Sequence, residues 1–239
     1  MRFSKSFELA VMIRKTDVHF FIPAFNEEQA ISEVIKTVRR CGYTNLYVVD
    51  DGSTDSTAEK ARQADAHVIH HLINRGVGAA TQTAIEWARK AGHSYMVLMD
   101  ADGQHSPQDI EALVQRMAAG SCDIVIGSRF LHDVSAMPRT RRWLNHMANV
   151  LTNLFCNYRY TDTQSGFRML NRRAVENLHL TLDGYGFCSE MLILAEQNGL
   201  KTAEVPTETI YTRYSLAKGQ DFYTGIRTAL NFVWNIIFK

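Results

Sequence analysis

Residues 95–107, YMVLMDADGQHSP, carry a short apolar run into two aspartates and a glycine turn. Pro107 suits a first helical position because its φ is fixed, and Ser106 before it can cap orphan N–H groups, so a helix is predicted to begin there. Two carboxylates about 5 Å apart repel by about 3 kcal/mol at an effective dielectric constant of about 20. The turn that holds Asp100 and Asp102 therefore calls for a cation.

The same pattern, an apolar run followed by a helix-period segment, repeats through the first half of the chain. The predicted strands cover residues 18–22, 46–50, 67–71, 95–99 and 123–127. The predicted helices between them cover residues 27–41, 55–65, 78–91 and 107–119. This alternation is typical of βαβ units, and it predicts an α/β fold with a mostly parallel open sheet flanked by helices.

Beyond residue 130 the alternation stops. The later predicted elements are a basic helix over 139–158, a strand at 165–170, a helix near 187–198, strands at 202–205 and 208–211, and a last amphipathic helix over 222–238. No linker or repeat divides the 239 residues, so a single domain over 1–239 is expected.

The composition narrows the class of protein. A net charge of +1 gives no overall attraction to nucleic acid. Four cysteines without CxxC spacing predict buried thiols in a reducing compartment, and they are Cys41, Cys122, Cys156 and Cys188. The apolar run at residues 9–13 is too short for a secretory signal, and no stretch approaches the roughly 18 apolar residues of a membrane span. We expect a cytoplasmic protein that does not cross a membrane.

Polar residues gather after four predicted strands, where ligands of an open parallel sheet bind. These strand ends read PAFNEE at 23–28, DDGSTDST at 50–57, NRGVGAAT at 74–81 and DADG at 100–103. Carboxylates are hard oxygen ligands that suit Mg²⁺ or Mn²⁺, and such ions commonly bring a substrate's phosphates as further ligands. A metal-bridged diphosphate is the simplest ligand for this edge. The residues alone also allow a helix-capping turn after the second strand and a solvated turn after the fourth.

The third strand end allows a further interpretation, a dinucleotide site. Gly76 and Gly78 lead into a helix whose N-terminus could hold phosphate. However, Thr81 stands where the third fingerprint glycine belongs, and the motif follows the third strand instead of the first. Both departures favour the metal and diphosphate interpretation.

Five motifs in this order and at these separations, PAFNEE, VVDDGSTDST, NRGVGAA, DADGQHSP and DIVIGSR, resemble those of the inverting GT-A glycosyltransferases of family 2. Over residues 18–215 the chain is similar to polyprenyl-phosphate sugar transferases of the dolichyl-phosphate mannose synthase type. The resemblance implies a GT-A fold with a nucleotide-sugar-binding half at 18–130, an acceptor-binding half at 131–239, and C-terminal amphipathic helices. It implies metal-dependent, inverting transfer of a sugar from a GDP- or UDP-sugar to dolichyl or undecaprenyl phosphate at the cytoplasmic membrane face.

Carried over position by position, the resemblance implies the site residues. The nucleotide-binding set is Pro23, Phe25, Glu27, Asp50, Asp51, Gly78, Asp100, Ala101 and Asp102. The metal set is Asp102, Gln104 and Asp100, with Asp102 and Gln104 nearest the ion. The acceptor-binding set is Arg129, Arg142, Gln164, Ser165, Arg213 and Lys218. The catalytic set is Asp102, Arg129 and Asp162, with Asp162 as the base for a hydroxyl acceptor.

Three further positions complete the comparison. Glu190 matches a family pattern on the acceptor side, and His105 is interpreted as a helix-start residue. Val77 stands where the family often has lysine, so the neighbouring Arg75 is the candidate for that diphosphate contact.

Residues 134–161 contain no acidic residue, while arginines bracket a helix with an apolar face. Such a segment is typical of a helix in a membrane interface, and equally of a core helix with a charged start. We expect the protein to contact the inner face of the membrane peripherally. The apolar surface of the last helix could pack on the domain, contact lipid or form a homo-oligomer. The alternative functions are transfer to a saccharide hydroxyl in cell-surface polysaccharide assembly and inactive nucleotide binding.

Overall fold

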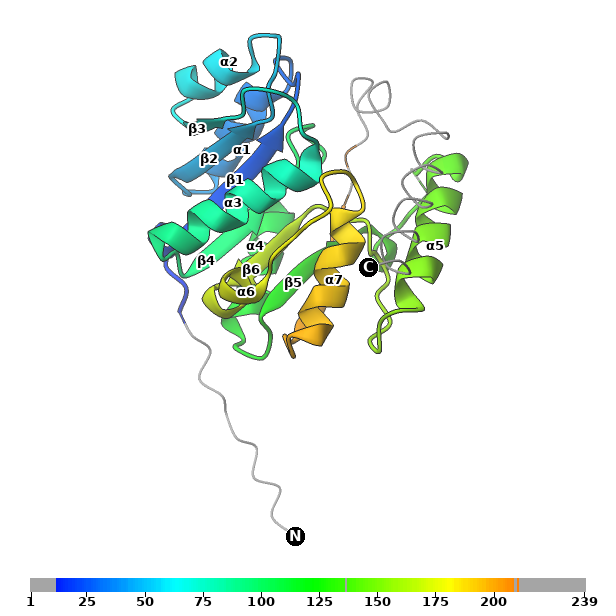
Figure 1. The fold of residues 1–239 in the computed structure, drawn as a ribbon. Coiled ribbons are helices and arrows are strands. Elements are labelled where there is room, and N and C mark those ends of the chain that lie inside the picture. The colour runs from blue at the N-terminus through cyan, green and yellow to red at the C-terminus, as the bar shows by residue number, and fades with distance from the viewer. Residues whose placement is uncertain (1–11, 136, 209, 211–239) are drawn as a thin grey trace.

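The computed structural model describes residues 12–135, 137–208 and 210. Its centre is a seven-stranded sheet with the order β3-β2-β1-β4-β6-β5-β7 (Figure 1). The strands are β1 (Val18–Ala24), β2 (Asn45–Asp50), β3 (His67–His70), β4 (Tyr95–Leu98), β5 (Ile124–Ser128), β6 (Arg168–Asn171) and β7 (Thr202–Pro206). Every pair is parallel except those that β6 makes with β4 and β5. The predicted mostly parallel open sheet is confirmed.

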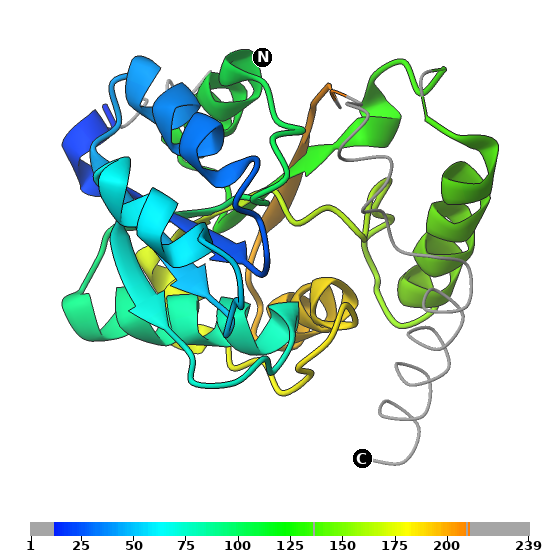
Figure 2. The same cartoon turned by 90° about the horizontal axis from the view of Figure 1, so that it is seen from above.

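Helices cover both faces of this sheet. They are α1 (Ile31–Arg40), α2 (Thr57–Gln63), α3 (Val77–Ala91), α4 (Pro107–Ala118), α5 (Arg139–Asn153), α6 (Arg172–Asn177) and α7 (Phe187–Gln197). Helices α1, α2 and α4 bury their apolar sides in one core, and α3, α6 and α7 bury theirs in a second core. Helix α5 contributes to neither core, and Figure 2 shows it set off from the sheet.

Three helices, α1, α2 and α5, are clearly shorter than the sequence predicted. At α1 and α5, turns and side chains take over the ends. Helix α1 begins at Ile31 instead of residue 27, since the amides of Ala30 and Ile31 both donate to the Glu27 carbonyl in a preceding turn. Helix α5 ends at Asn153 instead of residue 158. There the Asn153 side chain accepts from the Tyr160 amide and donates to the Tyr160 carbonyl, which replaces further helical bonds.

The strand predicted at 165–170 begins three residues before the observed strand β6. The helix that follows it, α6, was not predicted. The Ser165 hydroxyl accepts a hydrogen bond from the Phe167 amide, so a turn occupies the predicted first half of the strand. Helix α6 is capped by the Asn171 side chain, which accepts from the Ala174 amide. A six-residue helix is too short to show a clear hydrophobic period.

The expected last helix, over residues 222–238, lies outside the described residues. In the part of the chain that is described, no helix combines the length and apolar character needed to cross a bilayer. All four cysteine thiols are free; Cys122 and Cys188 are buried, whereas Cys41 and Cys156 are partly exposed.

Candidate active site

Helix α4 fixes the acidic turn that follows β4. The Ser106 hydroxyl accepts from the Asp109 amide at 3.3 Å, and the Asp109 carboxylate accepts from the Ser106 amide at 3.2 Å. This reciprocal capping box, with proline in the first helical turn, confirms the predicted helix start. The turn therefore presents its side chains from a defined backbone.

The chain leaving β7 crosses this turn. The Ile210 amide donates to the Gln104 carbonyl at 2.9 Å, and the Glu208 amide donates at 3.2 Å to the capping carboxylate of α4. Because these amides bind the turn instead of a neighbouring strand, the described residues 208 and 210 do not form the strand expected at 208–211. Two of the expected acceptor-binding residues lie outside the described part of the chain, Arg213 and Lys218.

Asp100 lies among positive charges. His105 Nε2 is 3.5 Å from Asp100 Oδ2, and the His105 ring stacks on Phe167 with 4.3 Å between ring centroids. Burial alone would raise the pKa of Asp100, but the neighbouring His105 ring and the positive charges of Arg129 and Arg168 hold that pKa below its usual value. His105 thus pairs with the acidic turn, and the helix-start role assigned to it belongs to the next residue.

Asp102 has a different environment. The described structure gives it a hydrogen bond from the Gln104 amide, at 3.1 Å to Oδ1. Burial, followed by the negative charge of Asp100 and that of Glu27, raises the pKa of Asp102 to about 6. A desolvated carboxylate beside like charges is stabilised by a cation. Of the two aspartates, Asp102 is therefore the one that calls for an ion.

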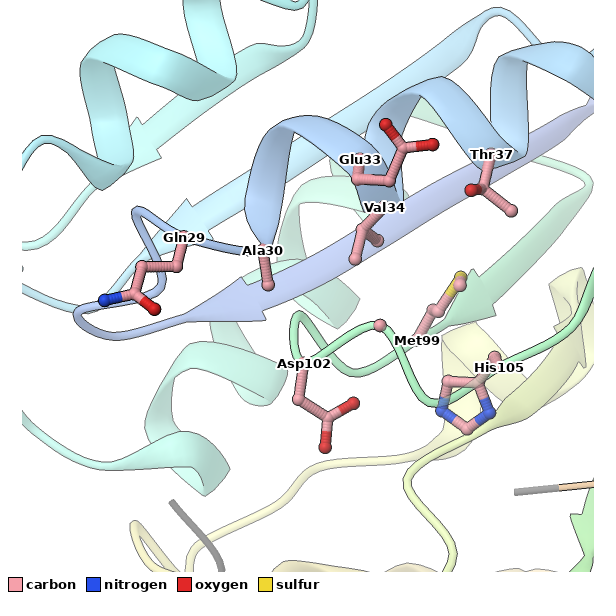
Figure 3. A pocket seen from close by; sticks show the side chains of 9 residues that line it. Gln29, Ala30, Glu33, Val34, Thr37, Met99, Asp102 and His105 are labelled. Atoms are coloured by element: carbon pink, nitrogen blue, oxygen red, sulfur yellow. The ribbon is translucent and has the colours of Figure 1, made fainter. Parts of the chain in front are cut away.

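A cavity of about 310 Å³ lies beside Asp102, between α1 and the acidic turn (Figure 3). Its lining residues are Gln29, Ala30, Glu33, Val34, Thr37, Met99, Asp102, Gly103 and His105. The sequence pointed to Asp102 but not to Glu33 and Thr37. Those two residues occupy polar positions of an amphipathic helix, so nothing in their spacing separates them from solvent-facing residues.

Asp51, at the end of β2, is engaged by the chain itself. Its carboxylate accepts from the amides of Arg75 and Gly76 at 3.1 and 2.7 Å, and lies 2.7 Å from His71 Nδ1. The carboxylate is buried. These contacts tie the loop between β3 and α3 to the end of β2, so Asp51 organises the expected nucleotide-binding edge from inside.

Asp50 is likewise buried and bonded. It accepts from the Ser53 amide at 3.2 Å and lies 2.7 Å from Nδ1 of the half-exposed His70. The capping alternative belongs to Asp55, whose two carboxylate oxygens accept from the amides of Thr57 and of the loop after β1. The motif after β2 therefore combines loop stabilisation with two buried acids.

The loop after β1 is bonded to the loop after β2. The Glu27 amide donates to the Thr57 hydroxyl at 2.7 Å, and the preceding amide donates to the Ser53 hydroxyl at 2.9 Å. Pro23 forms part of β1 beside β2, whereas the Phe25 ring is 42% exposed at the sheet edge. Glu27 lies near enough to Asp102 to affect its charge state. Of the residues expected after β1, the structure thus brings Glu27 close to the acidic turn.

The N-terminus of α3 is closed by another segment of the chain. The amides of Gly78 and Ala79 donate to the Asp183 carbonyl at 2.8 and 3.2 Å. A Cβ on Gly78 would lie 2.0 Å from the Leu182 carbonyl oxygen, and one on Gly76 would lie 2.3 Å from that of Asp183. Phosphate cannot approach these amides, which excludes the dinucleotide alternative. Gly78 was expected to contact the nucleotide, but it is buried and its amide is already used.

Arg129 and Asp162, both expected on the acceptor side, form an ion pair. Arg129 donates to both Asp162 carboxylate oxygens from Nε at 2.7 Å and from Nη2 at 2.8 Å, and its backbone amide adds a third bond at 3.1 Å. Asp162 is fully buried, and its own amide donates to the Glu204 carboxylate. The Arg129 side chain is 24% exposed. The pair therefore consists of a partly exposed arginine with the buried carboxylate behind it.

The turn at residues 163–166 lies directly against the acidic turn. A Cβ on Gly166 would lie 2.5 Å from Asp100 Oδ1. Gln164 donates to the Ser189 hydroxyl at 3.0 Å, while Ser165 holds the turn through the amide of Phe167. Of the expected acceptor residues, Gln164 and Ser165 are thus brought beside Arg129 and Asp100.

Two other expected site residues, Arg142 and Ala101, differ in their exposure. Arg142 is exposed in the first turns of α5, away from both sheet cores. Ala101 is buried between the two aspartates. The sequence reasoning missed Arg168, a fully buried cation in β6 whose Nη2 donates to the Thr163 carbonyl. Its signal, an arginine within an apolar run, also fits an exposed position on an edge strand.

The donor atoms at the acidic turn fit a shared divalent ion. The oxygens available are the carboxylates of Asp102 and Asp100 and the side-chain amide oxygen of Gln104, all hard ligands of the kind that Mg²⁺ and Mn²⁺ prefer. In the described ranges no three His, Cys, Asp or Glu side chains converge as a complete metal cage.

Known proteins resemble this chain over most of its length. The family model described as glycosyl transferase family 2 matches residues 20–178. A UDP-N-acetylglucosamine–dolichyl-phosphate N-acetylglucosaminyltransferase of Methanococcus voltae is 36% identical over 88% of this chain and 92% of its own length. A polyprenol monophosphomannose synthase of Mycolicibacterium smegmatis is 31% identical over 87% of this chain and 82% of its own.

A solved structure shares the fold. It is the glucosyl-3-phosphoglycerate synthase of Mycobacterium tuberculosis in complex with Mn²⁺ and uridine-diphosphate-glucose. The TM-score is 0.65 at 20% identity, over 91% of this chain and 78% of that one. Together with the family match and the two curated relatives, these findings show that the chain belongs to glycosyl transferase family 2 and is a glycosyltransferase.

Proposed function

We propose that this enzyme transfers a sugar from a nucleotide-sugar donor to polyprenyl phosphate, with inversion at the anomeric carbon and with Mg²⁺ or Mn²⁺ at Asp102. The observation that carries the acceptor assignment is the pairing of Arg129 with the fully buried Asp162. A lipid phosphate is already ionised at neutral pH, so it needs a cation to orient it and no strong base. Arg129 would supply that cation.

The donor side of the proposal rests on the sheet edge after β1, β2 and β4. The exposed Phe25 ring offers a surface for a base, and the buried Asp50 and Asp51 order the loops around it. Asp102 and Gln104 would hold the divalent ion, which when bound neutralises charge on the leaving diphosphate. The Mn²⁺ and UDP-glucose named for the solved relative support a donor of this chemical class.

The acceptor side of the proposal assigns a positioning task to each residue. Arg129 would orient the acceptor phosphate through charge-assisted hydrogen bonds, while Asp162 keeps the guanidinium in place. The turn at 163–166 lies against the acidic turn, so an acceptor phosphate oriented by Arg129 would lie close to a sugar donor bound there, with its oxygen able to attack opposite the leaving diphosphate. Attack from that side inverts the configuration.

Helix α5 supports peripheral contact with a membrane at its cytoplasmic face. Met147 and Val150 of α5 and its C-cap residue Leu154 are exposed, at 41%, 44% and 72%. Arginines begin the helix, and no acid occurs in residues 134–161. A basic helix with an exposed apolar side binds anionic lipid surfaces. Sedimentation with phosphatidylglycerol vesicles is expected to carry the enzyme down, whereas loss of all vesicle binding would contradict this part of the proposal.

Transfer to a saccharide hydroxyl is the second candidate, and it needs a general base. Asp162 was the expected base, but both of its oxygens accept from Arg129 and it is fully buried. Its geometry therefore favours positioning of Arg129 over proton abstraction. Among the described residues, nothing in the acceptor half favours the hydroxyl acceptor more strongly.

The direct test supplies radiolabelled UDP- and GDP-sugars, undecaprenyl or dolichyl phosphate, and Mg²⁺ or Mn²⁺ to the purified enzyme. We expect an organic-extractable labelled product that appears only when the lipid phosphate and the ion are both present. Label that enters only water-soluble glycan would contradict the lipid acceptor.

A variant at Arg129 tests the acceptor assignment. Arg129→Lys keeps a charge beside Asp162 but loses the two-pronged geometry, so we expect turnover to fall about tenfold or more while the affinity for nucleoside diphosphate stays within about twofold. Arg172→Lys, at an exposed ion pair with Glu176, is the matched control and should match the wild type. Equal losses in turnover and nucleotide affinity would argue against an acceptor role for Arg129.

A further inference from the structure

Residues 180–186 connect α6 to α7 and pack against the start of α3; we call this segment the strap. At its first residue, the Leu180 amide donates to Gln82 Oε1 of α3 at 2.8 Å. Further along, the Asp183 carbonyl accepts from the first amides of α3. The strap therefore connects the acceptor half, which includes α7, to the donor half, which includes α3.

The strap is held in place by Glu190 on the first turn of α7. Glu190 Oε1 accepts from the amide and the hydroxyl of Thr181, at 2.9 and 2.6 Å. Glu190 Oε2 accepts from the Leu182 amide at 3.0 Å. Each bond has an ionised acceptor, which makes it stronger than a neutral hydrogen bond. Both carboxylate oxygens thus serve the strap.

The strap in turn packs on the loop that enters α3. Gly78 and Gly76 have no room for a Cβ because the carbonyl oxygens of Leu182 and Asp183 lie against them. The Asp183 carboxylate also lies 3.6 Å from Nη2 of Arg75. The loop at residues 75–78 is therefore covered on one side by the strap.

The other side of the same loop is held by Asp51. Its carboxylate accepts from the amides of Arg75 and Gly76, at 3.1 and 2.7 Å. The loop is thus clamped between a buried acid of the donor half and the strap. A shift of the strap would move the Arg75 backbone and release one side of this clamp.

We propose that Glu190 is a positioning residue for nucleotide-sugar binding, which acts through the strap on the loop at residues 75–78. This rests on the proposed function, because that function assigns the nucleotide to the edge organised by Asp51. It differs from the acceptor-side placement that the sequence favoured for Glu190. A carboxylate with three internal donors is poorly placed to take a proton from an acceptor.

Glu190→Gln keeps the size of the side chain but turns one acceptor oxygen into an N–H group that faces a strap donor. We expect the affinity for UDP or GDP in the presence of Mn²⁺, measured by calorimetry, to fall about tenfold. The donor KM should rise by a similar factor, whereas kcat and the KM for lipid phosphate should stay within about twofold.

A second variant displaces the strap without touching Glu190. In Gly78→Ala the new Cβ meets the Leu182 carbonyl at 2.0 Å, so the strap must shift and nucleoside diphosphate affinity should also fall. Gly184→Ala is the matched control on the strap, because its Cβ would meet nothing within 4 Å, and it should bind like the wild type. Melting temperatures of all three variants check that each chain folds.

The double variant Glu190→Gln with Gly78→Ala shows whether the two substitutions act through the strap or independently of each other. If both changes act through the strap, the combined loss of affinity is clearly smaller than the product of the single losses. A full product would overturn the proposal, as would an unchanged donor affinity in Glu190→Gln together with a kcat loss of about 100-fold or more. Absence of nucleoside diphosphate binding by the wild type would overturn the proposed function as well, which distinguishes the two failures.

Discussion

The sheet edge carries two acidic pairs, after β2 and after β4, that look alike in sequence and differ in the structure. Asp50 and Asp51 accept hydrogen bonds from loop amides and lie against histidines. Asp102 accepts one backbone hydrogen bond, lines a cavity and has a raised pKa. The comparison teaches that an acid at a strand end becomes a candidate ion ligand when the fold leaves its charge uncompensated.

The difference arises from the backbone that follows each pair. After β2 the chain returns through residues 75–76, which supply amide donors to the Asp51 carboxylate. After β4 the chain leads through the acidic turn into α4, and the α4 capping box uses the Ser106 amide for Asp109. Asp102 therefore remains desolvated and beside the negative charge of Asp100.

Removing the charge of Asp102 should have the largest effect. In Asp102→Asn we expect sugar transfer to fall by about 1000-fold or more, because the leaving diphosphate would lose the stabilisation that a bound ion supplies. The radiolabel transfer assay measures this change. Asp65→Asn, at an exposed turn position paired with Arg39, is the control and should retain full activity. Substantial turnover in Asp102→Asn would remove Asp102 from the ion site.

Asp51→Asn should instead damage the fold. Its buried carboxylate holds two amides, and an amide group in its place would turn an N–H toward them, so we expect a loss of about 2 to 3 kcal/mol in the free energy of unfolding. Urea denaturation with the same Asp65→Asn control provides the measurement. If Asp51→Asn keeps full stability and loses nucleotide affinity, then Asp51 contacts the ligand directly. The acidic pairs after β2 and β4 would then differ less in function than the account states.

The smallest effect concerns the stability of the metal-free protein across pH. The folded pKa of Asp102, about 6, lies above its usual 3.8, so the folded state binds the proton more tightly than the unfolded state. The resulting stability is present below the unfolded value and is lost as pH rises through the folded value. Relative to Asp102→Asn, the free energy of unfolding of the wild type should fall by about 1 to 2 kcal/mol between about pH 4 and about pH 7. A constant difference between the two proteins would show that Asp102 titrates normally.

Much of the fold was predictable because its signals are local. The apolar runs of β1, β2 and β4 and the capped start of α4 determine backbone conformation within a few residues of themselves. The antiparallel placement of β6 between β4 and β5 was not predictable, because that pairing depends on contacts across more than forty residues of chain, such as Ile124 with Leu170. Local periodicity contains no record of such partners.

The candidate site divides in the same way. The acidic turn and Arg129 were predictable from residue type and motif. The structure brings them to the same edge of the sheet. The surroundings of Gly78 and Glu190 could not be predicted from the sequence, because both residues contact the strap, which lies about a hundred residues from Gly78. A motif shows which residue types are present. The hydrogen-bond donors around each side chain determine whether its atoms are still available to a ligand.

Calorimetric titration of the purified enzyme with UDP and with GDP, each with and without Mn²⁺, tests the central claim most directly. The account predicts binding of at least one nucleoside diphosphate that depends on the ion and disappears in Asp102→Asn. Binding that is equally tight without any divalent ion, or that survives in Asp102→Asn, would contradict it.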